Sequence, residues 1–86
     1  MRTVKSVKYV SGHTLLVEFD DGMVKSVDLG PHLEGPIFEP LKNREYFKTV
    51  QVSEDIGTIV WDNDADFSPE FLYEIGVEVG KPTRVG

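Results

Sequence analysis

The chain has 86 residues, no cysteine and a formal net charge of −6 at neutral pH. A chain of this length forms one domain with a small core. Without cysteine it can form neither a disulfide framework nor a cysteine-based zinc site. Residues 44–86 hold nine acidic and four basic residues, so most of the excess charge lies in the second half. An acidic surface repels phosphate groups, which disfavours direct binding to nucleic acid and to anionic membranes.

The start of the chain gives no sign of a targeting segment, because Lys5 and Lys8 interrupt every apolar run of the first ten residues. No stretch approaches the ~20 apolar residues that a membrane helix requires. We therefore expect a cytoplasmic protein.

The first half predicts an antiparallel meander of three strands, over residues 4–10, 14–19 and 23–29. The apolar residues of the first strand do not alternate cleanly, which indicates either a bulge or a strand covered on both faces. Those of the second strand alternate and form one buried face. Gly12 is expected at positive φ in the first turn. Asp21-Gly22 in the second turn indicates a type I′ hairpin, in which both central residues have positive φ.

Residues 30–49 combine turn signals with apolar bulk. Two Gly-Pro pairs bracket residues 32–34, which predicts a turn or a single helical turn. Pro40 limits regular structure in residues 37–41. Asn43 is expected to cap a short helix over residues 44–49.

The second half predicts another short hairpin, with strands 50–52 and 58–61, and a last helix. Ser68 is expected to cap this helix, and Gly76 to end it as a C′ glycine. We expect a single α+β domain over residues 1–76, with two short helices packed on the sheet. Residues 77–86 are a C-terminal tail or an added edge strand.

An acidic loop precedes the last helix. Asp62, Asp64 and Asp66 alternate like the first ligands of a calcium loop, and calcium prefers such hard oxygen ligands. Phe67 and Tyr73 occupy the places where an EF-hand needs Gly and Glu. Helix capping and the helix dipole explain an acidic loop without any ion. A small metal-binding protein or enzyme that uses loop 62–66 is therefore kept as an alternative, and no other cofactor is indicated.

The two histidines, His13 and His32, fall in expected loops without a nucleophile or a third metal ligand nearby, which favours exposed loop residues. Trp61 fits the core better than the surface, although an exposed tryptophan would anchor a partner. A partner-binding surface in the second half would consist of the acidic loop and the last helix, with Trp61, Asp62, Asp64, Asp66, Glu70, Tyr73 and Glu74.

The order and spacing of several short motifs resemble one small bacterial family. They are Asp21-Gly22, Val27-Asp28-Leu29, Phe38-Glu39-Pro40-Leu41, Gly57-Thr58-Ile59-Val60-Trp61 and Leu72-Tyr73-Glu74. Over residues 4–75 the chain is similar to the family catalogued as domain of unknown function 2442. Two places depart from its pattern: Asp62-Asn63-Asp64 stands where the family usually has Pro-Asn-Gly, and Asn43-Arg44 stands in place of Asp-Pro.

The resemblance implies a regulatory or partner-binding module. The family is similar to the N-terminal domain of longer bacterial proteins that carry a helix-turn-helix domain, and its genes often neighbour those of small toxin-like proteins. No catalytic residue or cofactor is carried over with it. We therefore expect a non-enzymatic, antitoxin-like interaction module that offers its acidic half to a small basic protein. A self-associating scaffold, forming a homo-oligomer, is the alternative.

Overall fold

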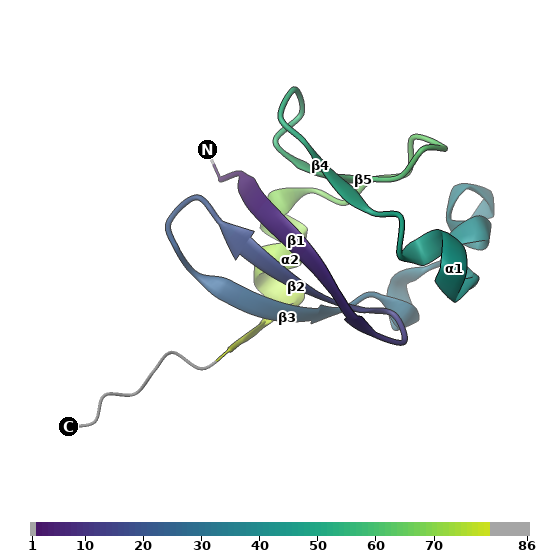
Figure 1. The fold of residues 1–86 in the computed structure, drawn as a ribbon, viewed down its shortest axis with the longest axis horizontal. Helices are drawn as coiled ribbons and strands as arrows, with labels where there is room; N and C mark the ends of the chain where they lie inside the picture. Colours follow the sequence, from purple (N-terminus) through teal and green to yellow (C-terminus); the bar gives the residue numbers. More distant parts are fainter. Residues whose placement is uncertain (1, 80–86) are drawn as a thin grey trace.

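A four-stranded antiparallel sheet forms one side of the molecule. The computed structural model describes residues 2–79. Strands β1 (Val4–Ser11), β2 (Thr14–Phe19) and β3 (Val24–Asp28) form the expected meander (Figure 1). Strand β6 (Val77–Glu78) pairs with β3, which gives the strand order β1-β2-β3-β6. An added edge strand is thus present, and residues 80–86 of the expected tail lie outside the described residues.

The strand patterns follow the sequence closely. The pairing of β1 with β2 shifts register between Val4 and Ser6 and again between Tyr9 and Ser11, which agrees with a bulge rather than with a strand covered on both faces. On β2, Leu15, Val17 and Phe19 are completely buried, and the residues between them are half-buried. This alternation places one face of the meander on the core.

The turn between β2 and β3 differs from the expected type I′ hairpin. Gly22 has φ of 88°, whereas Asp21 is not at positive φ. The N–H of Gly22 donates to the carbonyl of Phe19, and the N–H of Phe19 donates to the carbonyl of Met23, both at 2.9 Å. The Asp21 carboxylate accepts a bond from the N–H of Met23. This local bond stabilises a turn with one left-handed residue instead of two.

The middle of the chain is more helical than expected. Helix η1 (Gly30–His32) is a single 3₁₀ turn, which agrees with the expected helical turn but begins two residues earlier. A second 3₁₀ helix, η2 (Pro36–Lys42), forms where an irregular segment was expected. Pro40 is tolerated within η2 although it donates no hydrogen bond. Helix α1 (Arg44–Phe47) follows and is shorter than residues 44–49. The expected cap is confirmed, because the Asn43 side chain accepts bonds from the backbone of α1.

The second hairpin consists of β4 (Gln51–Ser53) and β5 (Thr58–Val60), as expected. Helix α2 (Pro69–Ile75) is capped by Ser68, whose hydroxyl oxygen accepts the N–H of Phe71 at 3.1 Å. Gly76 ends α2 in extended conformation, with φ of −73°, so it is not a left-handed C′ residue. A Cβ at this position would lie 2.8 Å from Cβ of Lys25, so close packing against β3 explains the glycine.

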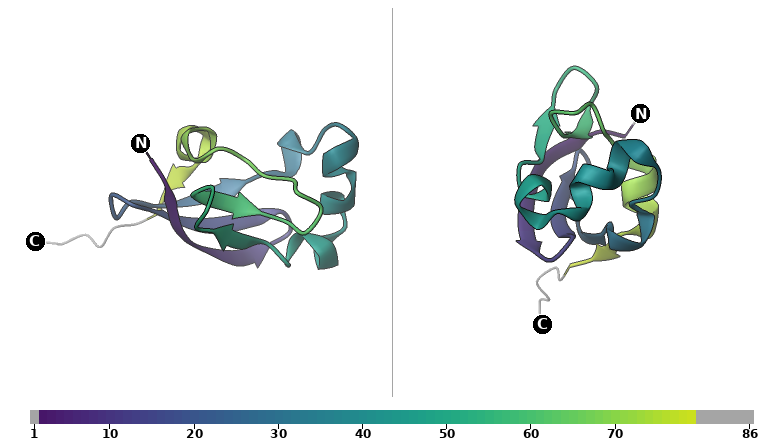
Figure 2. Two further views of the ribbon diagram at one scale, coloured as in Figure 1. Left: turned by 90° about the horizontal axis from the view of Figure 1, so that it is seen from above. Right: turned by 90° about the vertical axis from the view of Figure 1, so that its right-hand side faces the viewer.

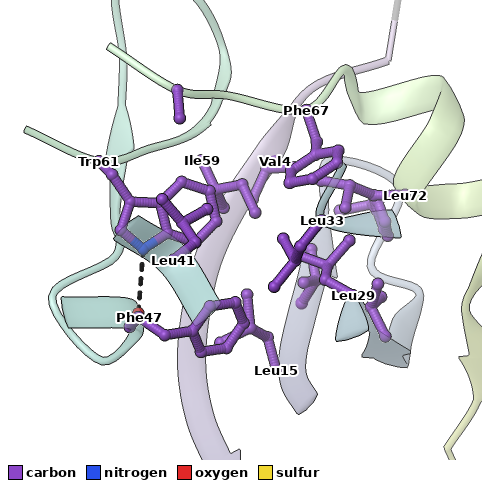
Figure 3. Close-up of a cluster of buried hydrophobic side chains, with 14 residues drawn as sticks. Val4, Leu15, Leu29, Leu33, Leu41, Phe47, Ile59, Trp61, Phe67 and Leu72 are labelled. Atoms are coloured by element: carbon purple, nitrogen blue, oxygen red, sulfur yellow. Dashed lines mark hydrogen bonds between the residues drawn. The ribbon is translucent and has the colours of Figure 1, made fainter. Parts of the chain in front are cut away.

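The core lies between the sheet, the β4–β5 hairpin and the helices. Figure 2 shows α2 on one face of the sheet, with the 3₁₀ helices at one end of the molecule. Trp61 is completely buried in the core, and its indole N–H donates to the carbonyl of Phe47 at 3.0 Å (Figure 3). Fourteen buried apolar side chains, from every part of the chain between Val4 and Leu72, form this single cluster.

Candidate functional site

Five carboxylates line the loop before α2 and the helix itself. All five are exposed, and none forms an ion pair with another residue of the range 2–79. We call them the acidic ridge: Asp62, Asp64, Asp66, Glu70 and Glu74. The expected partner-binding carboxylates therefore all lie at the surface, where they add to one another's negative potential.

The acidic loop repeats the hydrogen-bonding pattern of the β2–β3 turn. The N–H of Asp64 donates to the carbonyl of Trp61 at 2.9 Å, and the N–H of Trp61 donates to the carbonyl of Ala65 at 3.0 Å. Asp64 has φ of 72° and occupies the position that corresponds to Gly22 in the β2–β3 turn. It is the one non-glycine residue of the described chain with positive φ. An aspartate thus occupies a backbone conformation that favours glycine.

The three loop aspartates do not come together as ligands. Within residues 2–79, no group of three His, Cys, Asp or Glu side chains is arranged to hold a metal ion. The Asp64 N–H closes the turn, and Asp66 pairs with Val60 in an isolated β-bridge. The loop thus has a structural explanation in its own hydrogen bonds.

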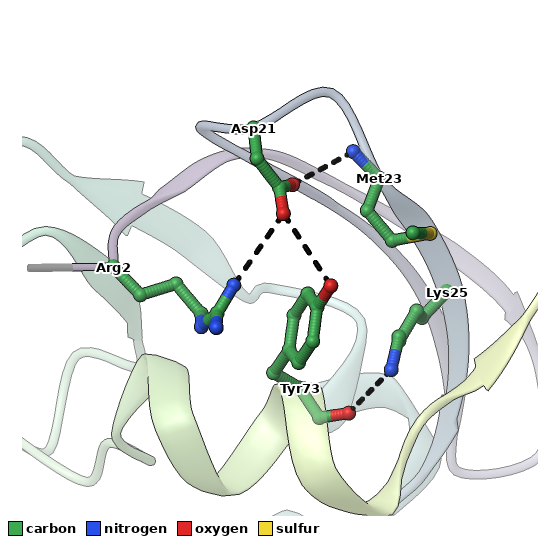
Figure 4. Close-up of polar contacts among 5 residues, drawn as sticks. All are labelled: Arg2, Asp21, Met23, Lys25 and Tyr73. Carbon is green, nitrogen blue, oxygen red and sulfur yellow. Dashed lines mark hydrogen bonds and ion pairs between the residues drawn. The ribbon is translucent and has the colours of Figure 1, made fainter.

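Trp61 and Tyr73, the two aromatic residues of the expected partner-binding surface, pack against other residues of the domain. Trp61 belongs to the core, so its indole offers no surface to a partner. Tyr73 is half-buried between two cations, with the guanidinium carbon of Arg2 3.5 Å and the Nζ of Lys25 3.8 Å from its ring centre. Figure 4 shows these two side chains on either side of the ring, with Asp21 above it.

Arg2, Lys25, Asp21 and Tyr73 form one cluster, in which each of the two cations has a second contact. The Arg2 guanidinium lies 3.5 Å from the Asp21 carboxylate, which also accepts the Tyr73 hydroxyl at 3.4 Å. The Lys25 ammonium donates to the carbonyl of Tyr73 at 2.7 Å. The cluster ties the start of the described chain and the β2–β3 hairpin to α2, which is a structural role.

An aromatic groove beside the acidic ridge is not apparent from the sequence. It has a volume of about 430 Å³. The ring of Phe67 stacks on Phe38 at 4.9 Å and on Phe71 at 5.8 Å, with interplanar angles of 21° and 15°. The groove contains no lysine or arginine, and its lining residues are Pro31, His32, Glu34, Phe38, Phe67, Ser68 and Phe71.

The histidines are less exposed than expected. The His32 ring meets the Phe71 ring edge-on at 5.1 Å and forms one wall of the aromatic groove. The His13 ring lies 4.9 Å from Phe47, and its Nε2 is 3.0 Å from the carbonyl oxygen of Lys42. Both side chains are half-buried because a nearby phenylalanine covers part of each ring.

The sequence indicates one wall of the groove through the spacing of Phe67 and Phe71. Phe67 and Phe71 are four residues apart across the cap of a helix, a spacing that brings two side chains to the same side. The other wall comes from the 3₁₀ helices, whose position depends on tertiary contacts. The Asn63 amide, for example, donates to the carbonyl of Ile37 at 2.9 Å and ties the acidic loop to η2.

These features define a small α+β domain with an antiparallel meander, a separate hairpin and an acidic, partly aromatic surface. None of the helices within residues 2–79 has both the length and the apolar character needed to cross a lipid bilayer. The chain belongs to the family described as "Protein of unknown function (DUF2442)", whose model matches residues 4–78. The resemblance inferred from the motifs is thereby confirmed.

A solved structure shares the fold. It is described as "Crystal Structure of Putative DNA Binding Protein NE0471 from Nitrosomonas europaea ATCC 19718". It is 25% identical in sequence, has a TM-score of 0.75, and the match covers 87% of this chain and 48% of that one. This chain therefore spans about half the length of that protein. None of the curated proteins matches this chain.

Proposed function

We propose that this chain is a non-enzymatic protein-interaction module that binds a basic partner protein through the acidic ridge. The observation that supports the proposal is the row of five exposed carboxylates without an ion pair in residues 2–79. The exposed carboxylates create a negative potential that attracts a partner of opposite charge. Such complementarity mainly raises the association rate and the specificity.

A small, basic, toxin-like protein fits this role, with the chain acting as an antitoxin-like regulator. The carboxylate of Asp64 supports this proposal, because it occupies a position where the backbone favours glycine and where the family usually has glycine. The ridge needs no catalytic group and no cofactor to act in this way.

We also propose that the chain does not contact DNA directly. The structural neighbour from Nitrosomonas europaea is described as "Putative DNA Binding Protein NE0471", and the match covers 48% of it. The net charge of −6 opposes the approach of a phosphate backbone. In a DNA-associated assembly, this domain would act through a protein partner.

The experiment measures the affinity of the full chain for the products of neighbouring genes, by isothermal titration calorimetry at about 50 and 500 mM salt, where screening differs strongly. We expect binding to a basic product that weakens at high salt. Salt-independent binding, or binding to none of the basic products, would contradict the proposal. A duplex DNA of mixed sequence serves as a further arm, and direct binding to it at low salt would overturn the proposal on DNA.

A matched pair of variants locates the interface. Asp62→Asn with Glu70→Gln removes two charges from the acidic ridge, and Glu54→Gln with Asp55→Asn removes two exposed charges from the β4–β5 turn. The first pair should weaken binding more than the second pair. Equal effects would show that net charge acts without a defined surface.

Self-association is the second candidate function, and strand β6 favours it. Val77 is 68% exposed on this two-residue edge strand. Exposed strand edges with apolar side chains pair readily with other chains. Sedimentation velocity over a hundredfold range of concentration tests this candidate, and a monomer at every concentration would exclude it.

A further inference from the structure

Residues of the aromatic groove and of the acidic ridge are neighbours along the chain before and within α2. Phe67 and Phe71 line the groove, and the exposed carboxylates of Asp66 and Glu70 precede them directly in the chain. Glu34 contributes an exposed carboxylate from the opposite wall. An apolar floor of phenylalanine rings is thus bordered by negative charge.

We propose that the aromatic groove receives one large apolar side chain of the partner, carried on a segment with lysine or arginine on both sides of it. This inference rests on the proposed function, because it takes the basic partner as given and identifies how that partner is anchored. The ridge would attract the segment, and the groove would fix its position.

The composition of the groove supports an apolar anchor. Its rings form part of the core cluster, with Phe67 8% exposed and Phe38 and Phe71 packed against it. The ring of Phe67 also contacts the buried Trp61, at 6.1 Å between ring centres, so the core supports the floor of the groove. A ligand that covers this floor gains binding free energy from the apolar surface it buries. Because the rings are already packed, little of that gain is lost to ordering side chains.

The charge pattern selects the flanking residues. The groove lining holds Glu34 and neither lysine nor arginine. An acidic segment would place like charges beside Glu34, Asp66 and Glu70, which costs binding free energy. Binding sites of this kind, with a central apolar pocket and a polar rim, concentrate their binding energy in the central side chain.

The experiment uses three five-residue peptides with blocked ends and the full ¹⁵N-labelled chain, observed by amide chemical shifts. The first is Lys-Arg-Trp-Arg-Lys, the second replaces its tryptophan with glycine, and the third is Glu-Glu-Trp-Glu-Glu. We expect the first peptide to shift groove amides, including those of His32, Glu34 and Phe71, and to bind about tenfold more tightly than the second, the effect of one well-seated anchor.

The peptides separate failure of the anchor from failure of the proposed function. If both basic peptides bind equally, with shifts confined to the acidic ridge, the anchor is wrong and the interaction module stands. If neither basic peptide binds, the basic-partner proposal fails, and the anchor fails with it. If the acidic peptide binds as tightly as the first, the required flanking charge is wrong.

Two variants test the groove directly. Phe71→Ala should remove the difference in affinity between the first two peptides, whereas Tyr46→Ala, a half-buried aromatic residue in α1, should preserve it. A full amide spectrum establishes that each variant is folded. Glu34→Gln changes only an exposed carboxylate and should weaken both basic peptides, which keeps the test decisive if Phe71→Ala does not fold.

Discussion

The guanidinium carbon of Arg2 lies 3.5 Å from the centre of the Tyr73 ring. This contact joins the first described residue to the last helix. Because the Lys25 ammonium lies 3.8 Å from the same ring centre, one tyrosine holds three segments together. The contact is electrostatic, since the face of an aromatic ring is negative.

Replacing Arg2 with alanine should lower the free energy of unfolding by about 0.5–1 kcal/mol, the usual worth of a partly exposed cation–π contact with a weak ion pair. Urea denaturation, followed by the fluorescence of Trp61, measures this loss. Tyr73→Phe is the control, because it keeps the ring and removes only the 3.4 Å bond to Asp21. A larger loss for Tyr73→Phe than for Arg2→Ala would contradict this account.

Asp64→Gly should stabilise the fold by about 0.5–1 kcal/mol, because φ of 72° is free of steric cost only for glycine. Asp62→Gly, in the same turn without positive φ, should give no such gain. Thermal unfolding of the two variants provides the comparison. A Tm for Asp64→Gly at or below that of the parent chain would show that the turn is not strained.

Two glycines should respond differently to substitution. At Gly76 a Cβ would lie 2.8 Å from Cβ of Lys25, whereas at Gly22 it would meet nothing within 4 Å but would need φ of 88°. Alanine should destabilise both, by about 1–3 kcal/mol at Gly76 from overpacking and about 1 kcal/mol at Gly22. Asparagine tolerates the left-handed region, so it should recover stability at Gly22 and not at Gly76. Equal recovery at both sites, measured by urea denaturation, would refute this distinction.

Trp61→Phe should cost about 2–4 kcal/mol, because it leaves a cavity and removes the N–H that bonds to the Phe47 carbonyl. Guanidinium denaturation followed by circular dichroism measures the loss, since the chain has a single tryptophan. Phe38→Leu, at a half-buried position, provides the comparison. A smaller loss for Trp61→Phe than for Phe38→Leu would show that the indole is not the central packing element.

The strands and helix caps could be predicted from the sequence because their causes are local. The alternation of Leu15, Val17 and Phe19 defines one strand face, and Asn43 and Ser68 satisfy backbone donors within three residues of themselves. The longer 3₁₀ helix, η2, was not predicted, because a proline-containing segment depends on the surface against which it packs.

The candidate site was predictable only in part. The carboxylates of the acidic ridge are exposed as expected, since charged residues of a loop and a short helix face water. The aromatic groove needs Phe38 and Phe71 to meet Phe67 from opposite directions along the chain. The burial of the histidines does not follow from local sequence, because ring contacts with Phe47 and Phe71 decide it.

The pairing of β6 with β3 has a consequence for the order in which the protein forms on the ribosome. Tyr73, which contacts Arg2 and Lys25, lies on α2, and β6 completes the sheet. Both elements are synthesised after the rest of the described chain. The meander can assemble early, but its core face stays uncovered until α2 has left the exit tunnel. The sheet is therefore completed only after β6 has emerged, and the emerging meander is the stage at which a chaperone would find exposed apolar surface.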